Sequence, residues 1–175
     1  MRRFMSKRVL IIDTSVLCCW LKVPGKDTAG PVEDLWTFER SEQVLNEAID
    51  DRATLVLPLA VLIETGNHIA QCKGDRYALA GQLSSLLTES VNGNIPWVPF
   101  AGQDALWTRD ALLRLAESWP ALAAGGTSIA DATIKDVAEF YAEAGLQVEI
   151  VTGDEGLRAY TPAVPAVRPR RRGGQ

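Results

Sequence analysis

Ile11-Ile12-Asp13-Thr14-Ser15 ends an apolar run that begins at Val9 and places a carboxylate and two hydroxyls directly after it. A short, continuous apolar run of this kind is typical of a strand buried in a parallel sheet. The polar triplet then lies at the carboxyl end of that strand, which is the edge of an open α/β sheet where ligands bind. The stretch therefore predicts a buried first strand and a polar site at its end.

Outward from this stretch, strand-like and helix-like segments alternate along the chain. Such alternation predicts an α/β fold with a parallel sheet covered on both faces. The predicted strands are 9–12, 54–57, 97–100 and 147–152. The predicted helices are 41–49, 59–72, 76–87, 104–118 and a segment from 127–128 to 144, with a loop over 24–31.

Two helix starts are predicted from local chemistry. Ser41 is a plausible N-cap for the helix that follows it, and Pro58 suits the entrance of the helix over 59–72. The apolar residues of this second helix are expected on its core side. They are Val61, Leu62, Ile63 and Ile69.

The chain of 175 residues fits one domain, which we assign to 8–160, followed by a tail over 161–175 rich in Pro and Arg and expected to be disordered. Residues 9–167 contain ten basic residues and all 22 acidic residues of the chain, so this part has a net charge of 10 − 22 = −12. An acidic body of this kind reaches a polyanion only through a metal ion or through local basic patches.

The chain lacks the features of an exported or membrane protein. No apolar stretch reaches the roughly 18 residues that a membrane span needs. The apolar run after the basic start is interrupted by Asp13, so it does not form the core of a signal peptide. Three cysteines, Cys18, Cys19 and Cys72, form no disulfide framework and indicate buried, reduced thiols. These observations predict a cytoplasmic protein with no membrane partner.

Two carboxylates stand at predicted strand ends. Asp13, taken alone, fits either an Asx-turn or helix cap or a ligand at the sheet edge. Thr14 and Ser15 either cap the following segment or hold a metal-bound water. Asp154 follows the last strand and repeats the arrangement, with Thr152 as its hydroxyl partner.

Two further carboxylates stand on predicted helices. Glu64 has apolar neighbours, although a lone glutamate on a helix usually faces solvent; His68 shares its helix face and is assigned to packing or hydrogen bonding. Asp131 follows Ser128 at the spacing of a capping box, which also places it in the first helical turn, towards the sheet edge. Four acids converging on one edge are hard to explain unless a divalent cation neutralises them, and oxygen ligands suit Mg²⁺ or Mn²⁺.

The order of these short motifs resembles the PIN-domain family of metal-dependent ribonucleases. The matching segments are Ile11-Ile12-Asp13-Thr14-Ser15, Val61-Leu62-Ile63-Glu64, Ile129-Ala130-Asp131-Ala132-Thr133-Ile134 and Val151-Thr152-Gly153-Asp154. The resemblance implies a three-layer α/β/α sandwich with a mostly parallel central sheet. It also implies Mg²⁺ or Mn²⁺ held by four catalytic carboxylates, Asp13, Glu64, Asp131 and Asp154. The family's hydroxyl positions beside these acids, which position substrate or water, are matched by Thr14, Ser15 and Thr152.

The activity that the resemblance implies is hydrolysis of RNA phosphodiester bonds. The hypothesis is attack by a water whose pKa the metal lowers, leaving 5′-phosphate and 3′-hydroxyl ends. The single histidine of the chain excludes a histidine acid–base pair. Many relatives are toxins of type II toxin–antitoxin pairs and others process RNA, so the implied partners are RNA, an antitoxin and a second copy of the chain. The alternative is a catalytically silent PIN-like binding or scaffold module.

Overall fold

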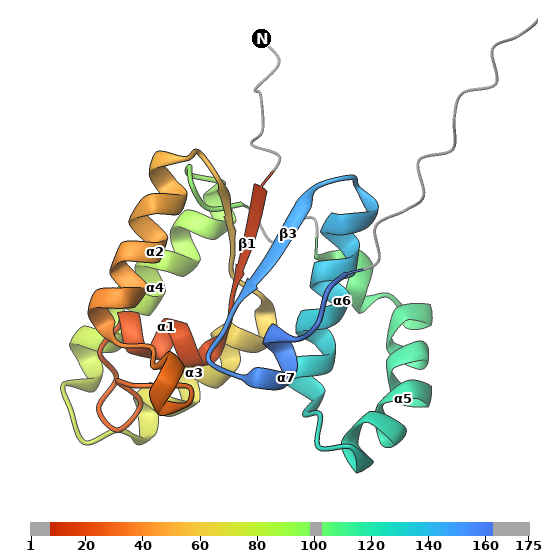
Figure 1. Ribbon diagram of the computed structural model, residues 1–175, viewed down its shortest axis with the longest axis horizontal. Coiled ribbons are helices and arrows are strands. Elements are labelled where there is room, and N and C mark those ends of the chain that lie inside the picture. The colour runs from red at the N-terminus through yellow and green to blue at the C-terminus, as the bar shows by residue number, and fades with distance from the viewer. Residues whose placement is uncertain (1–7, 99–102, 163–175) are drawn as a thin grey trace, which may run out of the picture.

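A three-stranded parallel sheet forms the centre of the computed structural model, which describes residues 8–98 and 103–162 (Figure 1). β1 (Arg8–Ile12) lies between β2 (Thr54–Val56) and β3 (Gln147–Val151). Val9 pairs with Thr54 on one side and with Val148 on the other. The β1 residues 9–12 are fully buried, as the continuous apolar run predicts for a central strand.

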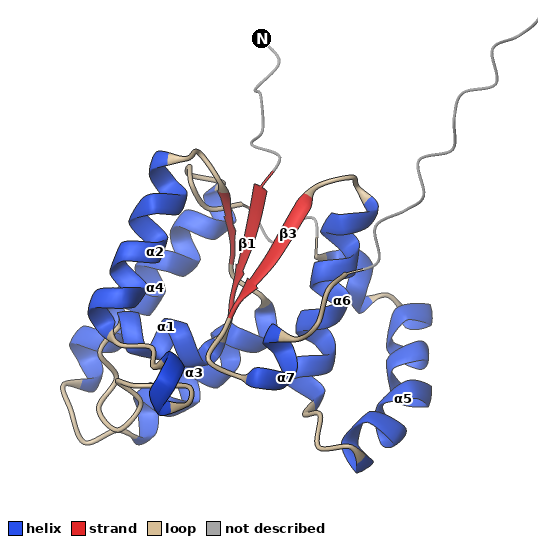
Figure 2. Cartoon of the chain, in the orientation of Figure 1, coloured by secondary structure: helices blue, strands red, loops and turns tan. Residues whose placement is uncertain are grey.

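Helices lie on both sides of the strands in this view. α1 to α4 lie on one side and α5 and α6 on the other, and Figure 2 shows the strands between the two groups of helices. The expected α/β class and the parallel sheet are therefore confirmed. The helices are α1 (Thr14–Trp20), α2 (Phe38–Asp50), α3 (Leu59–Gln71), α4 (Arg76–Asn92), α5 (Arg109–Ala124), α6 (Ile129–Glu143) and α7 (Glu155–Arg158), with short 3₁₀ turns at Val32–Asp34 and Asp104–Trp107.

Helix boundaries follow the capping chemistry, and one expected cap is wrong. Ser41 does not begin α2, because Thr37 is the N-cap and its side chain accepts a hydrogen bond from the Arg40 backbone N–H at 3.4 Å. Ser41 lies inside the first turns, fully buried, and its hydroxyl donates to the Thr37 carbonyl oxygen at 2.8 Å. Pro58 is the N-cap residue of α3, as expected.

The apolar residues of α3 do not all face the core. Val61 and Ile69 are buried and Leu62 is half-buried, but Ile63 is 56% exposed, so its expected core position is wrong. At 3.6 residues per turn, Ile63 lies about 200° around the helix from Val61. Proximity in sequence to a buried residue is therefore a poor guide within a helix.

Two predictions in the second half of the chain also need correction. The expected strand over 97–100 is reduced to one parallel bridge between Leu55 and Trp97, and its last two residues lie outside the described part. The expected helix over 104–118 divides into the 3₁₀ turn and α5. Thr108 causes the division, because its extended backbone ends the turn while its side chain caps α5 by accepting from the Ala111 N–H at 3.3 Å. α4 also extends beyond the expected end, stopping where Gly93 adopts φ +66°.

The buried strand should dominate the stability of the domain. Leu10→Ala removes a fully buried side chain of β1 and is expected to lower the free energy of unfolding by about 2–5 kcal/mol, because it leaves a cavity. Ile63→Ala is the matched control and should change it by no more than about 0.5 kcal/mol. Urea denaturation of both variants measures the difference. Equal losses in the two variants would contradict the assignment of the core.

The three cysteines are free and buried, as expected. Desolvation by burial raises the pKa of the Cys18 and Cys19 thiols to about 11. Since the thiolate is the reactive form, the folded protein is expected to leave a thiol reagent such as DTNB unreacted at about pH 8. In denaturant, all three thiols should react. A fast reaction of Cys18 or Cys19 in native buffer would contradict their burial.

Within the described ranges, none of the helices has both the length and the apolar character needed to cross a bilayer.

Candidate functional site

Asp13 lies at the carboxyl end of β1, only 5% exposed. Its backbone N–H donates to the Val151 carbonyl oxygen of β3 at 3.0 Å, which anchors it to the neighbouring strand. Its Oδ2 atom accepts three hydrogen bonds: from Ser15 N at 3.3 Å, Ser15 Oγ at 2.6 Å and Thr152 Oγ1 at 2.8 Å. Asp13 is also the N-cap of α1. It therefore caps a helix and lies at the sheet edge at the same time.

Thr14 connects the end of β1 to α3. Its Oγ1 donates to Glu64 Oε2 at 2.8 Å, and Thr14 itself is buried while Glu64 is half-buried. α1 packs against α3, which brings residues 50 positions apart into this contact. The helix therefore presents Glu64 to the sheet edge rather than to bulk solvent. His68, one turn later, is half-buried and belongs to no metal-binding group among the described residues.

The turn after β3 completes the same network. Thr152 Oγ1, which donates to Asp13, accepts from the Asp154 backbone N–H at 2.9 Å. The Gly153 N–H donates to Ser15 Oγ at 3.0 Å. Asp154 is exposed and caps α7, because its Oδ1 accepts from the Leu157 N–H at 2.8 Å.

Asp131 is held apart from this network by its own helix. It forms a full capping box with Ser128: Asp131 N donates to Ser128 Oγ at 3.0 Å, and Ser128 N donates to Asp131 Oδ2 at 3.4 Å. The capping box predicted from the sequence is confirmed. α6, which carries Asp131, packs against α3, β1 and β3, but in the described residues the carboxylate has no hydrogen bond to Asp13, Glu64 or Asp154.

The four carboxylates share one feature that is relevant to cation binding. In each, a protein donor engages one oxygen, and within residues 8–98 and 103–162 the second oxygen accepts no hydrogen bond. An oriented carboxylate with one open oxygen suits a hard cation such as Mg²⁺ or Mn²⁺. In the described part of the chain, however, no three His, Cys, Asp or Glu side chains are grouped closely enough to hold one ion. The donor set therefore fits a cation that keeps several of its waters, and not one enclosed by protein ligands.

No family model, curated protein or solved structure matches this chain. What the site does is therefore inferred from its own residues.

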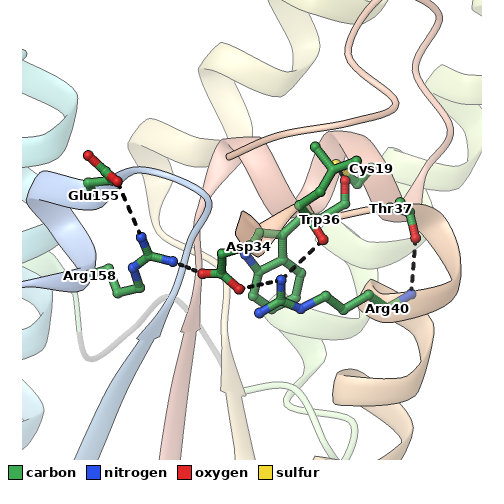
Figure 3. Close-up of polar contacts among 8 residues, drawn as sticks. Cys19, Asp34, Trp36, Thr37, Arg40, Glu155 and Arg158 are labelled. Atoms are coloured by element: carbon green, nitrogen blue, oxygen red, sulfur yellow. Dashed lines mark hydrogen bonds and ion pairs between the residues drawn. The ribbon is translucent and has the colours of Figure 1, made fainter. Parts of the chain in front are cut away.

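One neighbouring cluster was not expected from the sequence. Arg40 of α2 and Arg158 of α7 both form ion pairs with Asp34, beside the turn that carries Thr152 (Figure 3). Asp34 and Arg40 are six positions apart and form no recognisable motif, whereas Arg158 is 124 positions from Asp34 and is brought to it only by the fold. The one sequence feature that could have indicated this cluster is a basic residue, Arg158, four positions after Asp154.

Proposed function

We propose that the chain is a metal-dependent endoribonuclease of the PIN type, with the helices and sheet arranged as a three-layer α/β/α sandwich. The observation that carries this proposal is the network at the sheet edge. Asp13 is buried and held by Ser15 and Thr152, while Thr14 holds Glu64 and Thr152 holds the Asp154 backbone. Asp13, Asp131 and Asp154 also take part in helix capping, whereas the hydrogen bond from Thr14 to Glu64 caps no helix.

The proposed cofactor is Mg²⁺ or Mn²⁺, which would supply Lewis-acid activation of a water and neutralisation of charge on the leaving oxygen. Asp13 and Asp154 would hold the cation directly. Glu64 and Asp131 would do so directly or through water. Because no three such side chains are grouped in the described residues, one ion would contact at most two of these carboxylates directly, and any contact with the others would be through water.

The residues of the chain would orient the reaction. The hydroxyls of Thr14, Ser15 and Thr152 fix the carboxylates of Glu64 and Asp13, and each carboxylate keeps one oxygen without a hydrogen bond from the described residues. A water oxygen would lose a proton and form the new bond to phosphorus, while the bond from phosphorus to the 3′ oxygen breaks and that oxygen gains a proton. The products are a 5′-phosphate and a 3′-hydroxyl end. We propose that the chain acts either as a toxin or in RNA processing. Its protein partner would be an antitoxin or a second copy of the chain.

A catalytically silent PIN-like binding module is the second candidate. The observation that favours it is that no three acidic, His or Cys side chains in the described ranges form a direct metal site. The same parallel sheet and helices would then serve to bind RNA or protein. Activity and metal dependence separate the two functions.

The test is a cleavage assay with total RNA and a structured RNA, in Mg²⁺, in Mn²⁺ and in EDTA. We expect cutting with either ion, none in EDTA, and products that a 5′-phosphate-dependent exonuclease degrades. The circular dichroism spectrum confirms that the protein used is folded. A folded protein that leaves both RNAs intact in all three conditions would contradict the nuclease and support the binding module.

A further inference from the structure

A hollow of about 340 Å³ lies directly beside the candidate site. It is formed by β3, the chain around residue 34, the start of α2 and the segment from α7 to residue 162. Its lining includes Asp34, Trp36, Arg40, Thr152, Arg158 and Tyr160. A second acid, Glu149 of β3, also lines it and forms an ion pair with Arg8 at 2.9 Å. Thr152 belongs to the hollow and to the carboxylate network at once, since its hydroxyl donates to Asp13. Thr152 therefore connects the carboxylate network to this hollow.

The two arginines of the hollow bind the two oxygens of one carboxylate, that of Asp34. Arg40 Nη1 contacts Asp34 Oδ1 at 2.7 Å, and Arg158 Nη1 contacts Asp34 Oδ2 (Figure 3). The Arg40 guanidinium also lies over the Trp36 ring, 4.1 Å from its centroid, and donates to the Leu35 carbonyl oxygen at 3.1 Å. These contacts fix the direction of both guanidinium groups before any ligand binds.

These contacts leave donor capacity unused. Each guanidinium carries five N–H donors, and in the described residues Arg40 contacts acceptors only through Nη1. Arg158 uses Nη1 for Asp34 and reaches Glu155 only at 3.8 Å. The side chains of Arg40, Asp34 and Arg158 are 37%, 32% and 39% exposed. Ion pairs this exposed contribute about 0–1 kcal/mol each to stability, so folding alone gives little reason for them.

We propose that this hollow binds a phosphodiester of the RNA strand, next to the one that is cut, through Arg40 and Arg158. The fork of a guanidinium matches a phosphate in the same way that it matches a carboxylate, so a phosphate can bind through the N–H donors that Asp34 leaves unused. The domain has a net charge of −12 between residues 9 and 167 and needs local cations to approach a polyanion. The inference rests on the proposed function for its ligand, RNA.

The test combines cleavage kinetics with binding of a fluorescein-labelled single-stranded oligoribonucleotide, followed by anisotropy in EDTA. Arg40→Gln and Arg158→Gln should each raise KM by roughly three- to tenfold and leave kcat within about twofold, because they remove binding that is uniform along the reaction. The slope of log affinity against log salt should become shallower by about 0.7 for each arginine removed. Arg109→Gln is the matched control: it lies on α5, 84% exposed, and should change neither quantity.

The direction in which Asp34→Asn changes the affinity for the oligoribonucleotide is the decisive result. The substitution removes a negative charge beside the bound phosphate, so the affinity for the oligoribonucleotide should rise. If the three residues served only to hold the fold together, the same substitution would weaken binding or leave it unchanged. Arg158→Lys, which keeps the charge but loses the fork, should give an intermediate KM. Thermal unfolding of each variant shows whether a fold is retained.

The outcomes separate this inference from the proposed function. A wild type that cuts RNA while both arginine variants keep their KM and salt slope would overturn the inference alone. Loss of affinity in Asp34→Asn would also overturn it. Binding of the oligoribonucleotide that depends on Arg40 and Arg158, without cutting in any metal, would contradict the nuclease and support the hollow as an RNA subsite. A folded wild type that neither binds nor cuts RNA would overturn both.

Discussion

Asp13→Asn is expected to abolish metal-dependent RNA cleavage while the protein stays folded. The amide oxygen of Asn can accept the three hydrogen bonds from Ser15 and Thr152 that Oδ2 accepts now. The amide nitrogen then replaces the open oxygen, and an N–H donor cannot bind a cation. Loss of about 4 kcal/mol of transition-state stabilisation corresponds to roughly a thousandfold lower kcat/KM.

Stability is the control for this variant. Asn is as good an N-cap as Asp, so α1 should start as before. The free energy of unfolding should change by no more than about 2 kcal/mol, since the hydrogen bonds persist but lose their charge assistance. Urea denaturation and initial cleavage rates in Mn²⁺ measure the two effects. Normal cutting by Asp13→Asn would contradict the site, and unfolding of the variant would move the test to Asp154→Asn.

Gly153→Ala is expected to have the second largest effect, on cleavage and stability together. A Cβ at residue 153 would lie 2.9 Å from the Ala29 Cβ and 3.0 Å from the Gly30 backbone nitrogen. Backbone atoms cannot move aside as a flexible side chain does, so the turn and the loop at residues 29–30 must separate. Overpacking of this kind costs about 1–3 kcal/mol of stability. A displacement near 1 Å of Thr152 and Asp154 lowers kcat by about a hundredfold.

Gly81→Ala is the matched control for this substitution. Gly81 lies in α4, exposed, and a Cβ there meets no atom within 4 Å. Because alanine has a higher helix propensity than glycine, the free energy of unfolding of this variant should rise by up to about 1 kcal/mol, and its activity should be unchanged. Thermal unfolding and initial rates distinguish the two glycines. If Gly153→Ala cut RNA at the normal rate, the close approach of the loop would be irrelevant to the site.

The sequence predicts most of the sheet because its strands are short apolar runs with clear ends. β1 and β3 match the expected ranges within one residue, and the capping box at Ser128 and Asp131 is a local pattern that the structure retains. Local patterns also explain the failures. Ser41 has the chemistry of a cap, but Thr37 begins the helix first, and no sequence window decides between two good caps.

The candidate site is predicted less completely than the fold. Strand ends place Asp13 and Asp154 at one edge, but which hydroxyl donates to which carboxylate depends on helix packing that a linear pattern does not encode. The Thr14 contact with Glu64 depends on how α1 crosses α3. The ion pair of Arg158 with Asp34 joins residues 124 positions apart, which no local sequence pattern indicates.

The hydrogen bond between Asp13 and Thr152 joins residues 139 positions apart, across the pairing of the first strand with the last. On the ribosome, the first strand must therefore wait for almost the whole described chain before its partner is synthesised. Until residue 152 has left the exit tunnel, Asp13 has its contacts with Ser15 but lacks the Thr152 hydroxyl and the Val151 carbonyl oxygen. A nascent chain that has not reached residue 152 thus carries Asp13 and Glu64 without the complete network, and an activity that depended on this network would arise only after β3 has been synthesised.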